Sequence, residues 1–180
     1  PIRSTYLIGS GRANFVACHQ FSFLERLDVL DVAAPGATFL LNSPFGRETV
    51  WERLPVETQR TIVEKRLRFY VVDAQKIATT AGLGTRVNTI LQTCFFALAG
   101  VLDQAEAVAR IKAAIEKSYG KRGRSVVEQN FAAVDAALDG MREVPVPSGV
   151  AGDLHRPAAV PEGVRVATAC LELFHSVVLG

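Results

Sequence analysis

The 180-residue sequence has few cysteines, and the three that it has (Cys18, Cys94 and Cys170) lie far apart. It has no C-x-x-C pair and no histidine at ligand spacing, whereas zinc and iron–sulfur sites need clustered thiolates or imidazoles. We therefore expect no metal or cluster site in this chain. Cys18 and Cys94 sit in apolar segments, and we interpret both as small buried hydrophobic residues.

The sequence also lacks an excess of charge of one sign, with 20 basic and 18 acidic residues and a net charge of +2. This balance argues against nucleic acid or a membrane surface as a partner. The one dense basic stretch, at 117–124, is either a solvated helix end or a surface for an acidic ligand or domain. There is no run of 18 apolar residues and no signal-peptide pattern, so we expect a cytoplasmic protein without a membrane span.

Short apolar segments separated by helical patterns dominate residues 1–147. Segments of three to five residues predict strands at 6–8, 15–18, 38–41 and 69–72. Continuous hydrophobicity in short strands is typical of a parallel sheet covered on both faces, which predicts an α/β fold with three layers, α/β/α. Helical spacing of apolar residues predicts helices at 23–30, 56–66, 87–98, 105–119 and 126–141, with a helical turn at 50–54 and breakers at Pro35 and Gly36.

The composition changes after this region. Residues 142–147 read as an extended segment, and residues 148–162 are rich in proline, glycine and alanine, which is typical of a linker. Residues 164–180 are apolar apart from scattered Arg165, Glu172 and His175, and are too short and too polar to cross a bilayer. We expect one domain at 1–147, followed by a linker and an unassigned tail at 148–180.

Polar residues directly follow three of the predicted strands: His19, Asn42 and Asp73. In an open parallel sheet the ligand crevice lies outside the carboxyl ends of the strands, so these residues should meet at one edge. They either bind a polar ligand or partner there, or cap the following helices and satisfy loop backbone groups. Cys18 and His19 make a poor nucleophile–base pair, because successive strand residues point to opposite faces.

A second polar feature follows the double-glycine turn of Gly82 and Gly84. Arg86, Asn88 and Gln92 interrupt an otherwise apolar helix, so they must be hydrogen-bonded or point at something. The glycines lack the G-x-G-x-x-G spacing of a dinucleotide site, and a Schellman-type helix end explains at least one of them. With no G-x-S-x-G and no G-K-[ST] motif either, the residues alone indicate no self-contained active site.

Several blocks together resemble one family, the gamma domain of pyruvate:ferredoxin (flavodoxin) oxidoreductases, over residues 1–147 in matching order and spacing. The blocks are P-I-R-S-T-Y-L-I (1–8), F-V-A-C-H (15–19), G-A-T-F-L-L-N-S (36–43), F-Y-V-V-D-A (69–74), G-L-G-T-R-V-N-T-I-L-Q-T-C-F-F (82–96) and I-E-K-S-Y-G-K-R-G (115–123). The resemblance implies a three-layer domain that packs on other domains. The family's domain begins earlier with a glycine-rich strand–turn–helix, so we expect its amino-terminal part to be missing here. The sequence beyond about residue 160 departs from the family pattern.

The resemblance also implies a function. Enzymes of this family decarboxylate pyruvate oxidatively to acetyl-coenzyme A and pass electrons to ferredoxin or flavodoxin. Thiamine diphosphate, magnesium and iron–sulfur clusters would lie in other domains of a homo-oligomeric parent, so this chain would hold no cofactor and no catalytic residue. On its coenzyme A side, the candidate contacts are Arg3, Ser4, Arg86 and Asn88, since a guanidinium suits phosphate.

Two alternatives remain open. One is a free-standing gamma subunit that assembles with separate chains. The other is an independent small α/β enzyme that uses the strand-end residues His19, Asn42 and Asp73.

Overall fold

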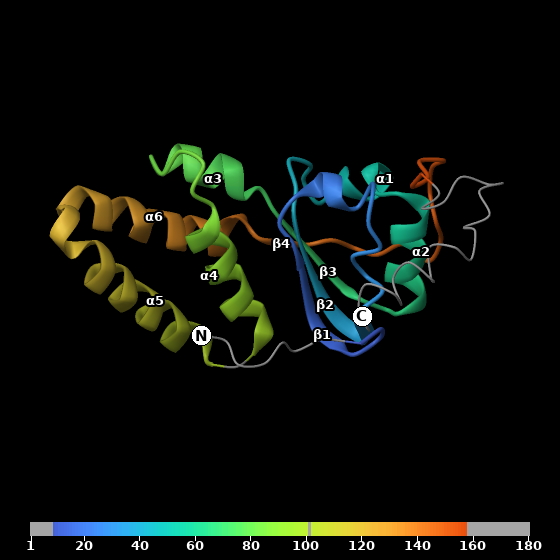
Figure 1. The fold of residues 1–180 in the computed structure, drawn as a ribbon, viewed down its shortest axis with the longest axis horizontal. Helices are drawn as coiled ribbons and strands as arrows, with labels where there is room; N and C mark the ends of the chain where they lie inside the picture. Colours follow the sequence, from blue (N-terminus) through green and yellow to red (C-terminus); the bar gives the residue numbers. More distant parts are fainter. Residues whose placement is uncertain (1–8, 101, 158–180) are drawn as a thin grey trace, which may run out of the picture.

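The computed structural model describes residues 9–100 and 102–157, in which a sheet is covered by helices on both faces (Figure 1). The predicted strand at 6–8 and the segment 164–180 lie outside this part of the chain. Within it the sheet has four strands in the order β1-β2-β3-β4. Their bounds are Ala13–Cys18 (β1), Ala33–Asn42 (β2), Arg68–Val72 (β3) and Arg142–Glu143 (β4).

The first three strands run parallel, and the two-residue β4 pairs antiparallel with β3. This confirms the predicted α/β fold with a mostly parallel sheet. β4 begins the segment that the sequence predicts as extended. The three apolar strands at 15–18, 38–41 and 69–72 are likewise confirmed, although β2 begins five residues earlier than expected.

Alternation along the strands gives the sheet two buried faces. Phe39 of β2 stacks on Phe69 of β3, with ring centroids 5.2 Å apart, in the core on one face. Leu40 and Val72 belong to the core on the other face. Because successive strand residues point to opposite sides, a continuous apolar run fits a sheet with two covered faces.

Helices cover these faces in two groups. Helices α1 (Val50–Arg53) and α2 (Val56–Glu64) pack on the Phe39 face. Helices α3 (Ala74–Thr80), α4 (Asn88–Ala99) and α6 (Arg124–Gly140) pack on the Leu40 face. Helix α5 (Gln104–Tyr119) lies on α4 and α6, away from the sheet, and a 3-10 turn, η2 (Gly120–Arg122), joins it to α6 (Figure 1).

The helix predictions at 56–66, 87–98, 105–119 and 126–141 are confirmed within a few residues, as is the helical turn at 50–54. Asp103 is the N-cap of α5, since its Oδ1 accepts hydrogen bonds from the backbone N–H groups of Ala105 at 2.9 Å and Glu106 at 3.4 Å. Such a cap satisfies N–H groups that the first turn leaves without partners. Helix α3 was not among the helices predicted from the sequence.

The predicted helix at 23–30 is wrong. The segment forms a 3-10 turn, η1 (Phe21–Phe23), followed by hydrogen-bonded turns. Its apolar residues do not share a face, because Leu24 and Leu30 are buried while Phe23 and Leu27 are exposed. The 3.6-residue spacing therefore did not reflect one helical stripe.

Pro35 and Gly36 were expected to end an element, but they lie inside β2. Between Ala33 and Thr38 the register with β1 shifts, so this part of the strand is irregular. Gly36 has a φ of 75°, and its N–H donates to the carbonyl of Lys65 at 2.7 Å instead of to a neighbouring strand. A bulge of this kind tolerates residues that break a regular strand.

Residues 150–156, here named the strap, lie against helix α2. The Gln59 side chain is fully buried and pairs with the Ala151 backbone, donating from Nε2 to its carbonyl at 2.8 Å and accepting its N–H at Oε1 at 2.7 Å. The Val56 N–H donates to the Leu154 carbonyl at 2.7 Å. These bonds fix a segment whose composition indicated only a linker.

A carboxylate holds the end of the strap. Glu57 accepts the Arg156 N–H at 3.0 Å and lies 2.8 Å from His155 Nδ1. Burial alone would raise the pKa of Glu57, but the hydrogen bonds from Arg156 and His155 outweigh it and lower the pKa to about 2. The ionised carboxylate is therefore the form that holds the strap.

Candidate functional site

The carboxyl ends of the three parallel strands meet at one edge of the sheet. In the pairing register Cys18 lies opposite Leu41, and Asn42 lies opposite Val72. His19, Asn42 and Asp73 follow at this edge, so the structure brings the predicted residues together as the parallel topology requires.

Hydrogen bonds at this edge show what two of these side chains do. Asn42 Nδ2 donates to the His19 carbonyl at 3.0 Å, and Asn42 Oδ1 accepts the Ala74 N–H at 3.0 Å. Asp73 Oδ1 accepts the Lys76 N–H at 2.9 Å and caps α3. Asn42 thus ties the end of β1 to the start of α3, and both side chains satisfy backbone groups.

Cys18, next to this edge, and Cys94, within helix α4, are both buried. Cys18 donates from Sγ to the Gln20 carbonyl at 3.1 Å, and burial raises the pKa of its thiol. His19, the next residue, has an exposed side chain. Cys94 lies in the core, where burial raises its pKa to about 12. The interpretation of Cys18 and Cys94 as small buried residues is confirmed by their exposed fractions of 3% and 0%. The raised pKa of each thiol favours its protonated, less reactive form.

The double-glycine turn after α3 is a Schellman helix end. The Gly82 N–H donates to the Thr79 carbonyl at 3.1 Å, and the Leu83 N–H donates to the Ala78 carbonyl at 2.8 Å. Gly82 has a φ of 74°, as the motif requires. Gly82 therefore ends helix α3, which agrees with the interpretation that a Schellman-type helix end explains at least one of the two glycines.

This turn positions Arg86 and Asn88. The Arg86 Nε donates to the Leu83 carbonyl at 3.0 Å, and the residue is otherwise exposed. Asn88 is the first residue of α4, which has no side-chain cap at its amino end. Arg3 and Ser4, the other two predicted contacts, lie outside the described residues.

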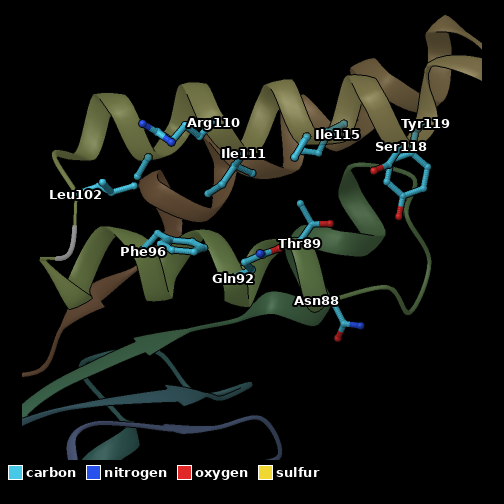
Figure 2. A pocket seen from close by; sticks show the side chains of 12 residues that line it. Asn88, Thr89, Gln92, Phe96, Leu102, Arg110, Ile111, Ile115, Ser118 and Tyr119 are labelled. Atoms are coloured by element: carbon cyan, nitrogen blue, oxygen red, sulfur yellow. The ribbon is translucent and has the colours of Figure 1, made fainter. Parts of the chain in front are cut away.

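A groove of about 440 Å³ runs between α4 and α5 (Figure 2). Its apolar lining includes Phe96 from α4 and Ile111 and Ile115 from α5. Asn88 lies at one end of the groove, close to the carboxyl end of α5, and Gln92 faces α5 farther along (Figure 2). The volume lies within the range of small-molecule sites.

The groove explains the polar residues of the apolar helix. Ile90, Leu91, Thr93 and Cys94 are buried, whereas Asn88 and Gln92 are exposed and belong to the lining of the groove. Helix α4 is therefore buried on one side only, although most of its residues are apolar. The polar spacing pointed to this place, but the groove itself depends on where α5 packs.

The rim of the groove carries a guanidinium that the sequence did not single out. Arg110 donates from Nη2 to Glu106 Oε1 at 2.7 Å, and both side chains are largely exposed. An exposed pair one helical turn apart contributes only about 0.3–0.5 kcal/mol, so Arg110 can exchange this partner for an anionic ligand at little cost.

Within residues 9–100 and 102–157, no group of three or more His, Cys, Asp and Glu side chains could hold a metal ion. In the same residues, no helix combines the length and the hydrophobicity that crossing a membrane would require.

Fold and site together define an α/β domain with a parallel sheet between helices, whose strand-end polar groups hold its own elements together. The sequence model of one family, pyruvate ferredoxin/flavodoxin oxidoreductase, matches residues 1–140. The chain belongs to this family, and the expected resemblance is confirmed.

Two relatives show how much of a larger protein the chain represents. It is 54% identical over 147 residues to the pyruvate-flavodoxin oxidoreductase of Nostoc sp., covering 82% of this chain and 12% of that protein. It is 48% identical over 174 residues to the pyruvate-flavodoxin oxidoreductase of Rhodospirillum rubrum, covering 95% of this chain and 14% of that protein. The second match extends past residue 160, and the chain spans only a small part of both relatives.

A solved structure shares the fold. The pyruvate oxidoreductase subunit PORC of Thermotoga maritima matches with a TM-score of 0.57 and 17% identity, covering 73% of this chain and 65% of that subunit. At this identity the likeness shows the fold alone.

Proposed function

We propose that residues 1–147 are the gamma-like domain of an enzyme that oxidatively decarboxylates pyruvate to acetyl-coenzyme A and passes the electrons to ferredoxin or flavodoxin. The family match over residues 1–140 carries this proposal. The names of the two relatives support it, and the share of their length that the chain spans, 12–14%, supports a part of a larger protein. Residues 148–180 then connect this domain to the rest.

The domain is structural and not catalytic alone. Thiamine diphosphate, magnesium and iron–sulfur clusters lie in other domains or subunits of a cytoplasmic, homo-oligomeric parent enzyme. The hydrogen bonds of Asn42 and Asp73 support this assignment of the chemistry to other domains. Both side chains accept backbone N–H groups at the start of α3, and a carboxylate such as Asp73 that caps a helix is a poor choice of catalytic base.

The coenzyme A side of the domain is the end of the groove where α4 begins. Asn88 lines the groove there, and Arg86, two residues earlier in the chain, donates one Nε hydrogen bond to the Leu83 carbonyl. A guanidinium pairs well with phosphate, and an amide side chain can donate to or accept from the amides of a pantetheine chain. Arg3 and Ser4 are the further proposed contacts.

Titration calorimetry with coenzyme A tests this role in the 180-residue chain, once light scattering shows a monodisperse sample. In the full-length enzyme, Arg86→Gln should raise the KM for coenzyme A several-fold and leave the KM for pyruvate unchanged. The matched control is Arg60→Gln, because Arg60 is exposed on helix α2, on the opposite face of the sheet. Equal effects of the two substitutions would refute the assignment of Arg86.

The alternative of a free-standing gamma subunit has one observation in its favour, since the Thermotoga maritima protein of similar fold is itself a subunit. The subunit masses of the purified native enzyme separate the two proposals. An independent enzyme built on His19 would instead lose a measurable turnover in His19→Ala.

A further inference from the structure

An exposed apolar patch lies where the strap meets the 20–30 segment. Few large hydrophobic residues in the described part of the chain are exposed by more than a third, and most of those few are here. This strap patch consists of Phe23 (41% exposed), Leu27 (56%), Val150 (42%) and Leu154 (46%). Single exposed apolar residues are ordinary, but a group of them marks a surface that another segment covers.

Hydrogen bonds hold the two parts of the strap patch together. Arg156 donates from Nη1 to the Leu27 carbonyl at 2.8 Å and lies 3.4 Å from the Asp28 carboxylate. The Leu27 N–H donates to the Phe23 carbonyl at 2.8 Å, which places these two residues on one turn. The patch is therefore a fixed surface, joined to α2 through Leu154 and Glu57.

The chain itself offers an occupant for this surface. Residues 164–180 contain 11 hydrophobic residues among 17 and only two charged ones, Arg165 and Glu172. Neither the fold nor the proposed function accounts for this composition. The described chain ends at Pro157, directly after the residue that contacts Leu27. Seven residues can span up to about 25 Å, so the apolar segment begins within reach of the patch.

We propose that residues 164–180 bind the strap patch of the same molecule. Tethering makes this contact intramolecular, with an effective concentration in the millimolar range for a short linker, so the tail outcompetes a second copy at ordinary concentrations. Apolar side chains on both surfaces then leave water, which is the main driving force for such contacts. The strap then connects the domain to the bound segment.

A thiol cross-link tests the proposal, because Cys170 lies in the tail while Cys18 and Cys94 are buried. The 180-residue chain with Leu27→Cys is treated with a short bismaleimide at low concentration and digested for mass spectrometry. Ala113→Cys, exposed on α5 across the sheet, is the matched control. We expect the Leu27→Cys thiol to link to Cys170 within monomers at least five-fold more than the control thiol.

Two results would overturn the proposal. One is a yield no higher than that of Ala113→Cys, and the other is a link found mainly in dimers, which would assign the patch to a second copy. Hydrogen exchange gives an independent measurement on the whole chain: Leu173→Asp should speed exchange of the 20–30 amides, and Ser176→Asp should not. Unchanged exchange in Leu173→Asp would also contradict the proposal.

Discussion

Gln59 joins three segments of the domain through one buried amide. Its Nε2 lies within hydrogen-bonding distance of the carbonyls of Trp51 at 3.0 Å, Leu54 at 2.9 Å and Ala151 at 2.8 Å, so its two N–H groups are shared among three acceptors. Its Oε1 accepts the Ala151 N–H at 2.7 Å. The side chain is fully buried, so water cannot replace these partners without opening the site. We expect its removal to loosen both the α1–α2 turn and the strap.

The magnitude follows from the three full bonds that this amide can make, two donated and one accepted. Each contributes about 0.5–1.5 kcal/mol net, so Gln59→Met, which keeps the shape and removes the amide, should lose about 3 kcal/mol. The Trp51 carbonyl keeps a partner in the Leu54 N–H, so its loss of Gln59 should cost least. For a chain of this size about 3 kcal/mol lowers Tm by roughly 6–12 °C.

Urea unfolding measures this loss directly. Trp51 is the single tryptophan, is buried, and lies beside the site, so its fluorescence reports the local transition, while circular dichroism reports the helices. Gln104→Met, exposed at the start of α5, is the control and should change stability little. Gln59→Glu, which keeps the acceptor but loses the donor, should be more harmful at pH 7 and partly recover at low pH when protonated. A loss under 1 kcal/mol for Gln59→Met would refute the reasoning.

Three further predictions concern stability. The pKa of Glu57 in the folded chain, about 2, is below the ordinary value of 4.5. Its contribution to the free energy of unfolding is therefore present above pH 4.5 and is lost as the pH falls toward 2. The urea midpoint of Glu57→Gln should change less with acid than that of the unsubstituted chain. Gly82→Ala places a Cβ 2.8 Å from Gln129 Nε2 at a φ of 74° and should cost about 1–2 kcal/mol in thermal unfolding, more than Gly84→Ala, where the space is open. Asn42→Ala should lose about 1–2 kcal/mol in chemical unfolding, with Asn42→Asp, which keeps the acceptor for α3, losing less.

Local chemistry let the sequence predict much of this fold. Apolar runs of four or five residues have few alternatives to a doubly covered strand, and all three inside the described chain form one. Asp103 and Gly82 act through neighbours within five residues, so their roles as helix start and helix end could be predicted. The meeting of His19, Asn42 and Asp73 follows from parallel topology alone.

Long-range contacts account for what the sequence could not predict. Gln59 and Ala151 are 92 residues apart, and nothing in a proline- and glycine-rich segment indicates that its backbone pairs with a buried amide. The α4–α5 groove forms only where α5 packs beside α4, and the polar residues of α4 alone do not predict that packing. In the 20–30 segment, the apolar residues have the spacing of a helix, but only Leu24 and Leu30 are buried in the folded chain.

The way in which the strand-end residues are used limits where a ligand can bind. Asn42 and Asp73 each accept a backbone N–H that starts α3, so turning either side chain toward a ligand would leave that donor without its partner. Arg86 is an exposed residue that donates only from its Nε, to the Leu83 carbonyl, and it precedes by two positions Asn88, which lines the groove. Substitutions should separate the two kinds of residue. Asn42→Ala should lower Tm, and it should reduce coenzyme A binding only in proportion to the fraction of protein that is unfolded. Arg86→Gln should weaken coenzyme A binding at an unchanged Tm, and a fall in Tm with unaltered binding would place Arg86 among the structural residues instead.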